Sequence, residues 1–186
     1  MVFDFFDKKG LCVLVGAGVG GREMLTADGE YWLGRADVVI YDRLADDSLL
    51  ELVRSDAEMI YVGKQAGDHT MPQEQINALL VKYTLEGRLV VRLKGGDCFI
   101  FGRGGEELDA LEAAGCQYRV VPGITAAIAA GAYGGISLTD RRYASGVAFV
   151  TGHEDPAKQT SSLNYTALAG IDTVVFYMGV GHLEPI

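Results

Sequence analysis

Three glycines near the start of the chain have the spacing of a turn that binds phosphate groups. Gly16, Gly18 and Gly21 fit the pattern G-x-G-x-x-G directly after an apolar run, and Asp42 closes the next apolar run. A glycine turn followed about 20 residues later by an acid is the sequence form of a βαβ unit that binds a dinucleotide. A nicotinamide or flavin oxidoreductase is therefore the first hypothesis.

A second group of candidate residues lies in the segment LKGGDCFIFGRGGEE, residues 93–107, which holds five glycines together with Asp97 and Arg103. It lacks the G-K-[ST] ending of a phosphate loop, which disfavours nucleotide hydrolysis. Backbone without side chains can come close to a ligand. A tight connection from strand to helix would explain two of these glycines but not five.

Cationic side chains also gather in segments that are rich in glycine or resemble turns. The chain has a net charge of −9, which disfavours nucleic acid as a partner. Cations on neighbouring loops would form a local positive pocket that attracts an anionic small molecule, although each one alone fits a solvated loop charge. These residues are Arg22, Arg43, Lys64, Lys94, Arg103, Arg141 and Arg142.

The cysteines and histidines predict neither a disulfide framework nor a metal site. The three cysteines, Cys12, Cys98 and Cys116, include no C-x-x-C pair, and the three histidines are scattered. No apolar run reaches the roughly 18 residues of a membrane span, and the N-terminal segment lacks the apolar core of a signal peptide. We expect a cytoplasmic protein with no metal and no membrane partner.

The elements that must position these residues alternate between strands and helices. Continuous apolar strands that alternate with helices predict an α/β domain with a parallel sheet covered on both faces, here over residues 10–121. The glycine-rich loops then meet at the carboxyl edge of the sheet and line a large cleft. The expected strands are 11–16, 37–42, 57–63, 88–96 and 118–123, and the expected helices are 22–36, 47–56, 72–87 and 106–115.

Residues 122–186 predict the beginning of a second α/β domain. A segment of small residues, 124–138, precedes two further strands at 146–153 and 172–181. Two strands are too few for a stable sheet with its own core. We therefore expect an incomplete, C-terminally truncated domain, with the ligand cleft between the two domains.

The order and spacing of seven segments over residues 11–181 resemble the tetrapyrrole methylase family. This resemblance implies that S-adenosylmethionine lies in the cleft and that the first glycine loop does not bind a dinucleotide. The most similar branch methylates ring carbons of uroporphyrinogen III to give precorrin-2, on the way to siroheme or cobalamin, and works as a homodimer. The segments are VGAGVGG, ADVVIYDRL, YVGKQAGDHTMPQEQINALL, VVRLKGGDCFIFGRGGEE, VVPGITAA, FVTGH and VVFYMG.

The resemblance also assigns roles by position. It implies that Asp42 is a proton acceptor and Lys64 a proton donor, while Arg103, Glu106 and Arg141 face the anionic tetrapyrrole. Other roles stay open: Asp42 could cap the next turn, Lys64 could be a solvated loop residue, Met178 could be core, and Asp97 and Arg103 could hold their loop. The implied cofactor-binding residues are Val19, Gly95, Gly96, Asp97, Ile100, Thr125, Ala126 and Met178.

The chain departs from the family pattern at several positions, mainly on the substrate side of the cleft. Val19 and Gly21 replace a proline and an acid, Cys98 and Ser137 replace prolines, and Asp140 replaces a histidine. A non-catalytic binding module of the same fold is therefore kept as a rival hypothesis, beside the nicotinamide oxidoreductase.

Overall fold

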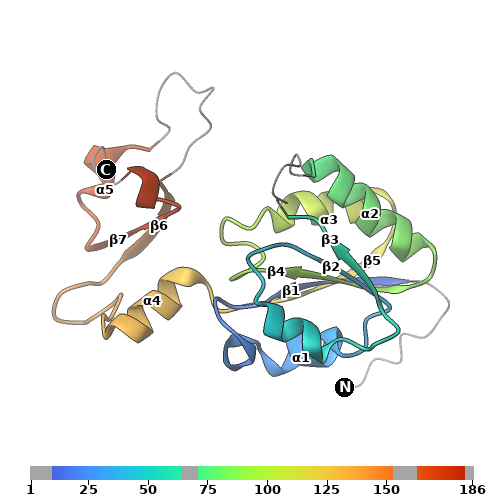
Figure 1. Ribbon diagram of the computed structural model, residues 1–186. Helices are drawn as coiled ribbons and strands as arrows, with labels where there is room; N and C mark the ends of the chain where they lie inside the picture. Colours follow the sequence, from blue (N-terminus) through green and yellow to red (C-terminus); the bar gives the residue numbers. More distant parts are fainter. Residues whose placement is uncertain (1–9, 64–70, 153–162, 183–186) are drawn as a thin grey trace. The chain divides into compact units, whose positions relative to one another are not determined.

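The computed structural model describes residues 10–63, 71–152 and 163–182. The chain divides into two compact units, Met1–Thr125 and Ala126–Ile186 (Figure 1). This division differs from the expected boundary after residue 121 only by the loop that follows the fifth strand.

The first unit contains a five-stranded sheet in which all strands are parallel, as the sequence predicts. Its strand order is β3-β2-β4-β1-β5, so β4 lies at the centre between β2 and β1. β1 and β4 are paired from Leu11 and Leu89 to Gly16 and Lys94, which brings their carboxyl ends level. The strands are β1 (Leu11–Gly16), β2 (Val38–Tyr41), β3 (Glu58–Tyr61), β4 (Leu89–Lys94) and β5 (Gln117–Val121).

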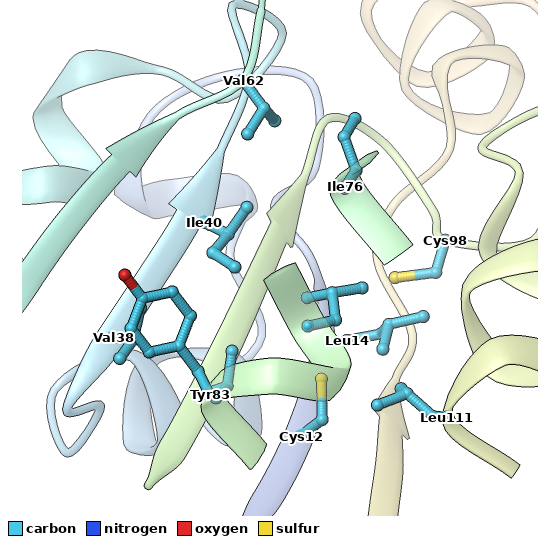
Figure 2. Packing of buried hydrophobic residues seen from close by; sticks show 11 residues of the cluster. Cys12, Leu14, Val38, Ile40, Val62, Ile76, Tyr83, Cys98 and Leu111 are labelled. Atoms are coloured by element: carbon cyan, nitrogen blue, oxygen red, sulfur yellow. The ribbon is translucent and has the colours of Figure 1, made fainter. Parts of the chain in front are cut away.

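Both faces of this sheet are covered, and β1 buries apolar side chains on each of them. Val13 and Val15 pack toward α1 (Ala27–Leu33) and the 3-10 helix η2 (Asp47–Leu52). Cys12 and Leu14 point the other way, toward α2 (Gln73–Leu85) and α3 (Gly104–Ala113), which lie on the opposite face (Figure 1). Figure 2 shows this second cluster, in which Leu14 and Ile40 of the sheet face Leu111 and Ile76 of the helices.

The two helices α2 and α3 follow the sequence expectation. Pro72 precedes the first residue of α2, and Gly87 after its end has a positive φ of 82°. Gly115 plays the same part after α3, with a φ of 68°. A left-handed residue after the last helical turn is the usual conformation that ends an α-helix.

The expected helices at 22–36 and 47–56 are both shorter in the structure. Residues 22–36 split into the 3-10 helix η1 (Arg22–Met24) and α1, because the hydroxyl of Thr26 accepts the Gly29 N–H at 3.1 Å and starts a new helix there. Residues 47–56 contain only the 3-10 helix η2, which Asp46 caps through the Ser48 N–H.

The second unit has few elements. The phenolic oxygen of Tyr177 accepts the Ala127 N–H at 3.1 Å and ties the start of α4 to the end of β7. Among the described residues its sheet contains only the parallel pair β6 and β7. The elements are α4 (Ala126–Gly134), β6 (Val147–Thr151), α5 (Tyr165–Leu168), β7 (Thr173–Tyr177) and η3 (Val180–His182).

None of the helices in the described part of the chain is long and apolar enough to cross a bilayer.

Candidate functional site at the carboxyl edge of the sheet

The loops that follow β1 and β4 are joined to each other by backbone hydrogen bonds. The Gly18 N–H donates to the Gly96 carbonyl at 3.1 Å, and the Gly96 N–H donates to the Gly18 carbonyl at 2.6 Å. The Ala17 N–H also donates to the Lys94 carbonyl at 2.8 Å. The pairing of the two strands therefore continues into their loops and fixes them relative to each other.

The loop after β5 joins this pair through contacts between backbones. A Cβ atom on Gly16 would lie 2.5 Å from the Gly123 nitrogen, and one on Gly123 would overlap the Gly96 carbonyl oxygen. The Asp97 carboxylate strengthens the contact, because its Oδ2 accepts the Gly123 N–H at 3.0 Å. We call this meeting of three loops, at Gly16, Gly18, Gly96 and Gly123, the glycine junction.

At Gly96, in the glycine junction, an added Cβ atom would make only ordinary van der Waals contacts with the other two loops. This residue has a φ of 68°, and a Cβ added to it would lie 3.9 Å from the Thr125 Cα and 4.0 Å from the Val19 Cγ1, with no heavy atom nearer. Val19, Gly96 and Thr125 come from three different loops, and all three are among the predicted cofactor-binding residues. The structure therefore brings these three predicted residues together.

Two other predicted cofactor residues, Gly95 and Asp97, hold the loops in place. Gly95 packs against Leu44, since a Cβ on it would lie 2.7 Å from the Leu44 carbonyl oxygen. The Asp97 Oδ1 accepts the N–H groups of Phe99 and Ile100 at 2.8 and 3.2 Å. With the Gly123 bond, the carboxylate of Asp97 accepts three backbone N–H groups, so the loop-holding role that the sequence left open is present in the structure.

Three predicted cofactor residues remain: Ile100 is half-buried in the first unit, and Ala126 and Met178 lie in the second unit. Ala126 is exposed at the start of α4. Met178 follows β7 with a φ of 56°, and 57% of it is exposed. The alternative that Met178 is a core residue is therefore wrong.

Asp42 lies at the end of β2 and has two partners within the first unit. Its Oδ1 accepts the Leu44 N–H at 3.0 Å, so the predicted turn-capping role is confirmed. Its Oδ2 accepts Nη2 of Arg92 at 2.9 Å, and 24% of the Asp42 side chain remains exposed. The other predicted catalytic residue, Lys64, lies outside the described residues.

A cluster of buried charges lies beneath this edge, on the face covered by α2 and α3. The Oε1 of Glu107, on α3, accepts Nε of Arg92 at 3.0 Å and Nζ of Lys94 at 2.9 Å. Glu107 has no exposed surface, and within the described residues its Oε2 has no hydrogen-bond partner. Burial, together with the charge of Arg92, lowers the pKa of the Lys94 ammonium group. The prediction that Lys94 lies in a positive pocket of loop cations is therefore wrong.

Sequence reasoning missed the partners of this cluster, although a signal was present. Arg92 and Lys94 alternate with apolar residues inside a strand that is otherwise apolar, so both side chains point to one buried face. A buried cation requires an anion. Glu107 lies on α3, the helix that follows this strand directly, so the sequence offered it as the anion that pairs with the two cations.

The residues predicted to face the tetrapyrrole lie in both units. Arg103 donates from Nε and Nη2 to the two carboxylate oxygens of Glu106, each at 2.7 Å, and this pair is exposed. The hydrogen bond from Arg103 lowers the pKa of Glu106. Arg141 is an exposed turn residue of the second unit, where Asp140 pairs with the neighbouring Arg142 at 2.7 Å.

The departure at Cys98 does not provide a reactive group. Cys98 is fully buried in the cluster shown in Figure 2, and burial raises the pKa of its thiol to about 12. Because the thiolate is the nucleophilic form, this cysteine acts as a small apolar side chain. Its carbonyl oxygen also accepts the Gly104 N–H at 3.0 Å at the start of α3.

The first glycine loop lacks the form that binds a dinucleotide. In that motif a helix begins at the loop and directs its N-terminus at the pyrophosphate. Here η1 and its capping residues separate the loop from α1, which begins only at Ala27. Gly18 pairs with Gly96 instead. The nicotinamide or flavin hypothesis is therefore wrong.

Comparison with known proteins shows the family of this chain. The family model described as Tetrapyrrole (Corrin/Porphyrin) Methylases matches residues 12–186. The chain belongs to this family. A siroheme synthase of Baumannia cicadellinicola subsp. Homalodisca coagulata is 56% identical over 180 residues, which are 96% of this chain and 39% of that protein. This methylase chain thus spans well under half of the length of that curated relative.

Solved structures of tetrapyrrole methylases share the fold. The uroporphyrin-III C-methyltransferase of Thermus thermophilus, complexed with S-adenyl homocysteine, is 41% identical with a TM-score of 0.76 over 92% of this chain and 71% of that one. A cobalt precorrin-4 methyltransferase is 27% identical with a TM-score of 0.80, over 94% of this chain and 71% of that one.

The glycine junction of this tetrapyrrole methylase leads to a stability prediction. We expect Gly123→Ala to lower the free energy of unfolding by about 1–3 kcal/mol, because the added methyl group must displace backbone atoms of two other loops. Gly105→Ala is the matched control, since a Cβ there meets nothing within 4 Å and the residue is helical. The control should gain up to about 1 kcal/mol. Urea unfolding measures both values, and equal changes would contradict the junction.

Proposed function

We propose that this chain is a methyltransferase that uses S-adenosylmethionine to methylate ring carbons of uroporphyrinogen III, giving precorrin-2. The proposal is supported by family membership and by similarity to siroheme synthase and to a uroporphyrin-III C-methyltransferase complexed with S-adenyl homocysteine. The single observation that carries it is that three loops bearing predicted cofactor residues, Val19, Gly96 and Thr125, meet at Gly96.

The residues near Gly96 suit the cofactor chemically. Val19 is apolar with 41% of its surface exposed, and the half-buried Ile100 follows in the same loop as Gly96. A bare backbone next to apolar side chains suits the adenosine and methionine parts of such a ligand. We propose that Val19, Gly96, Ile100 and Thr125 contact the cofactor, that Gly95 and Asp97 fix the loop, and that Ala126 and Met178 contribute from the second unit.

When bound, S-adenosylmethionine supplies a sulfonium methyl group that a nucleophilic carbon can attack. The chain's own residues then align the ring and move protons. Asp42, anchored at the end of β2, accepts a proton from a ring atom beside the methylated carbon, which itself carries no hydrogen. Lys64 donates a proton when a proton is relocated within the ring system, so that each methyl transfer releases one proton net. Arg103 and Arg141 bind ring carboxylates, for which guanidinium groups are suited because they donate two parallel hydrogen bonds. For Arg103 this requires exchange of its partner Glu106 for a ligand carboxylate.

Calorimetric titration with S-adenosylhomocysteine tests the cofactor site. We expect the wild-type chain to bind and Gly96→Ala to bind at least about tenfold more weakly, a loss of about 1.4 kcal/mol, because the methyl group would lie beside Val19 and Thr125, where we propose that the cofactor binds. Gly115→Ala is the matched control: its φ is also 68°, but no atom lies within 4 Å of the added Cβ. Absence of binding to wild type, or equal weakening in both variants, would refute the site.

Transfer of labelled methyl groups to uroporphyrinogen III tests the activity and separates an enzyme from a binding module of the same fold.

We also propose a homodimeric full-length protein in the cytoplasm. The second unit supports an association with a partner chain, because its described sheet has two strands, which are rarely stable by themselves. The three free cysteines are consistent with a reducing compartment. Light scattering after size-exclusion chromatography tests the dimer.

A further inference from the structure

The proposed proton acceptor Asp42 is tied to the buried charge cluster by Arg92. We propose that Arg92 is a positioning residue for Asp42 and that Glu107 holds Arg92 in place from beneath the edge of the sheet. This inference rests on the proposed function for the chemical role of Asp42, but its geometry concerns the described residues alone.

The Arg92 guanidinium is fixed by hydrogen bonds to three different elements. Nε donates to Glu107 on α3 at 3.0 Å, Nη1 donates to the Leu93 carbonyl on β4 at 3.0 Å, and Nη2 donates to Asp42 at 2.9 Å. A weaker bond at 3.4 Å joins Nη1 to the Ile40 carbonyl on β2. Because the guanidinium is planar and is held from several sides, it can rotate little, and the carboxylates that accept its hydrogen bonds are fixed with it.

The charges of the cluster balance only when Asp42 is included. Glu107 accepts hydrogen bonds from both Arg92 and Lys94 on one oxygen, and Gln73 donates to the same oxygen at 3.3 Å. One carboxylate thus faces two buried cations, and Asp42 is the second anion in contact with them. The positive charge of the two cations therefore attracts the Asp42 carboxylate toward Arg92 and disfavours its other orientations.

Both oxygens of Asp42 are anchored within the first unit. Oδ2 is held by Arg92, Oδ1 accepts the Leu44 N–H at 3.0 Å, and the side chain is still partly exposed. Stable packing alone does not require ions here, because apolar side chains of similar volume often replace a buried ion pair without loss of stability. A carboxylate with fixed direction at a partly exposed sheet edge is what a proton acceptor needs.

The test compares Arg92→Lys with wild type in the full 186-residue chain. Lysine keeps the charge and can pair with Glu107, but its single ammonium group cannot also reach Asp42 in the planar arrangement of a guanidinium. We expect hydrogen exchange of the Leu44 amide, which reports the Asp42 orientation, to become at least about tenfold faster. The kcat of methyl transfer should fall about 100-fold, with the KM for S-adenosylmethionine unchanged.

Arg88→Lys is the matched control, because Arg88 pairs with Glu58 at 2.6 Å and with the Asp37 carbonyl at 3.1 Å at the opposite end of the sheet. It should change neither the Leu44 amide nor kcat. If Arg92→Lys fails to fold, Asp42→Asn gives the reciprocal measurement. The separate Nη proton signals of Arg92 should then merge, because the side chain rotates faster without its carboxylate partner.

The outcomes distinguish this inference from the proposed function. Unchanged Leu44 exchange in Arg92→Lys overturns positioning, as does retained kcat in that variant. Unchanged Nη signals in Asp42→Asn overturn it as well. If wild type transfers no methyl group, the proposed function is refuted, and the Leu44 and Nη measurements still decide whether Arg92 positions Asp42.

Discussion

Replacement of Glu107 by alanine is expected to lower the free energy of unfolding by about 3–5 kcal/mol, because two buried cations lose their shared anion. Arg92 and Lys94 are almost fully buried, so water cannot take the place of the carboxylate. Urea unfolding followed by circular dichroism measures the loss.

Glu106→Ala provides the control for this prediction. Glu106 precedes Glu107 on α3 and also pairs with an arginine, but that pair is exposed. Its removal should cost about 0–1 kcal/mol. Simultaneous replacement of Arg92 and Lys94 by methionine and Glu107 by leucine should restore most of the stability. Similar losses in the two alanine variants would show that the buried charges do not depend on Glu107.

Asp97→Ala is expected to have the second largest effect, about 2–4 kcal/mol of unfolding free energy. A hydrogen bond to a charged group contributes about 1.5–3 kcal/mol, and the alanine removes the acceptor of three backbone N–H groups, one of them at the exposed Phe99. The loops after β4 and β5 then separate, so the affinity for S-adenosylhomocysteine should fall together with stability. Denaturant unfolding and calorimetric titration of the same variant measure the two losses.

Asp97→Asn and Arg103→Ala are the controls. Asparagine keeps one acceptor oxygen without the charge and should lose about half as much stability. Arg103→Ala removes only an exposed pair and should cost about 0–1 kcal/mol, which leaves a folded protein for measuring tetrapyrrole binding. Full cofactor affinity in a destabilised Asp97→Ala variant would show that the loop contact does not shape the cofactor site.

The sheet was predictable because its signals are local. The strands β1 and β2 are continuous apolar runs, the other strands of the first unit are mainly apolar, and the buried side chains of α2 repeat with the helical period. The shorter helices were not predictable in the same way. The hydroxyl of Thr26 alone caps the start of α1, so that α1 is separate from η1. Asp46 caps the 3-10 helix η2, where an α-helix was expected.

The candidate site was predictable as a set of loops but not in its contacts. Parallel strands place their carboxyl ends at one edge, so the convergence of glycine loops follows from the strand pattern. Whether a Cβ atom on a glycine would make only ordinary contacts, as at Gly96, or would overlap a distant backbone, as at Gly95 and Gly123, depends on residues far away in sequence. The pairing of Arg92 with Asp42 depends in the same way on the strand order β2-β4.

The strand order also determines when this sheet can form during synthesis. Within the described residues β1 is the first strand, yet it pairs with β4 and β5, so that Leu11 lies opposite Leu89. Roughly 80 residues separate these partners, which the ribosome adds in about 4–16 s at about 5–20 residues per second. The most apolar strand of the unit therefore leaves the ribosome well before it can be paired. Such a delay between synthesis and pairing slows folding and exposes the nascent strand to association with other chains, so this order favours an early encounter with a chaperone.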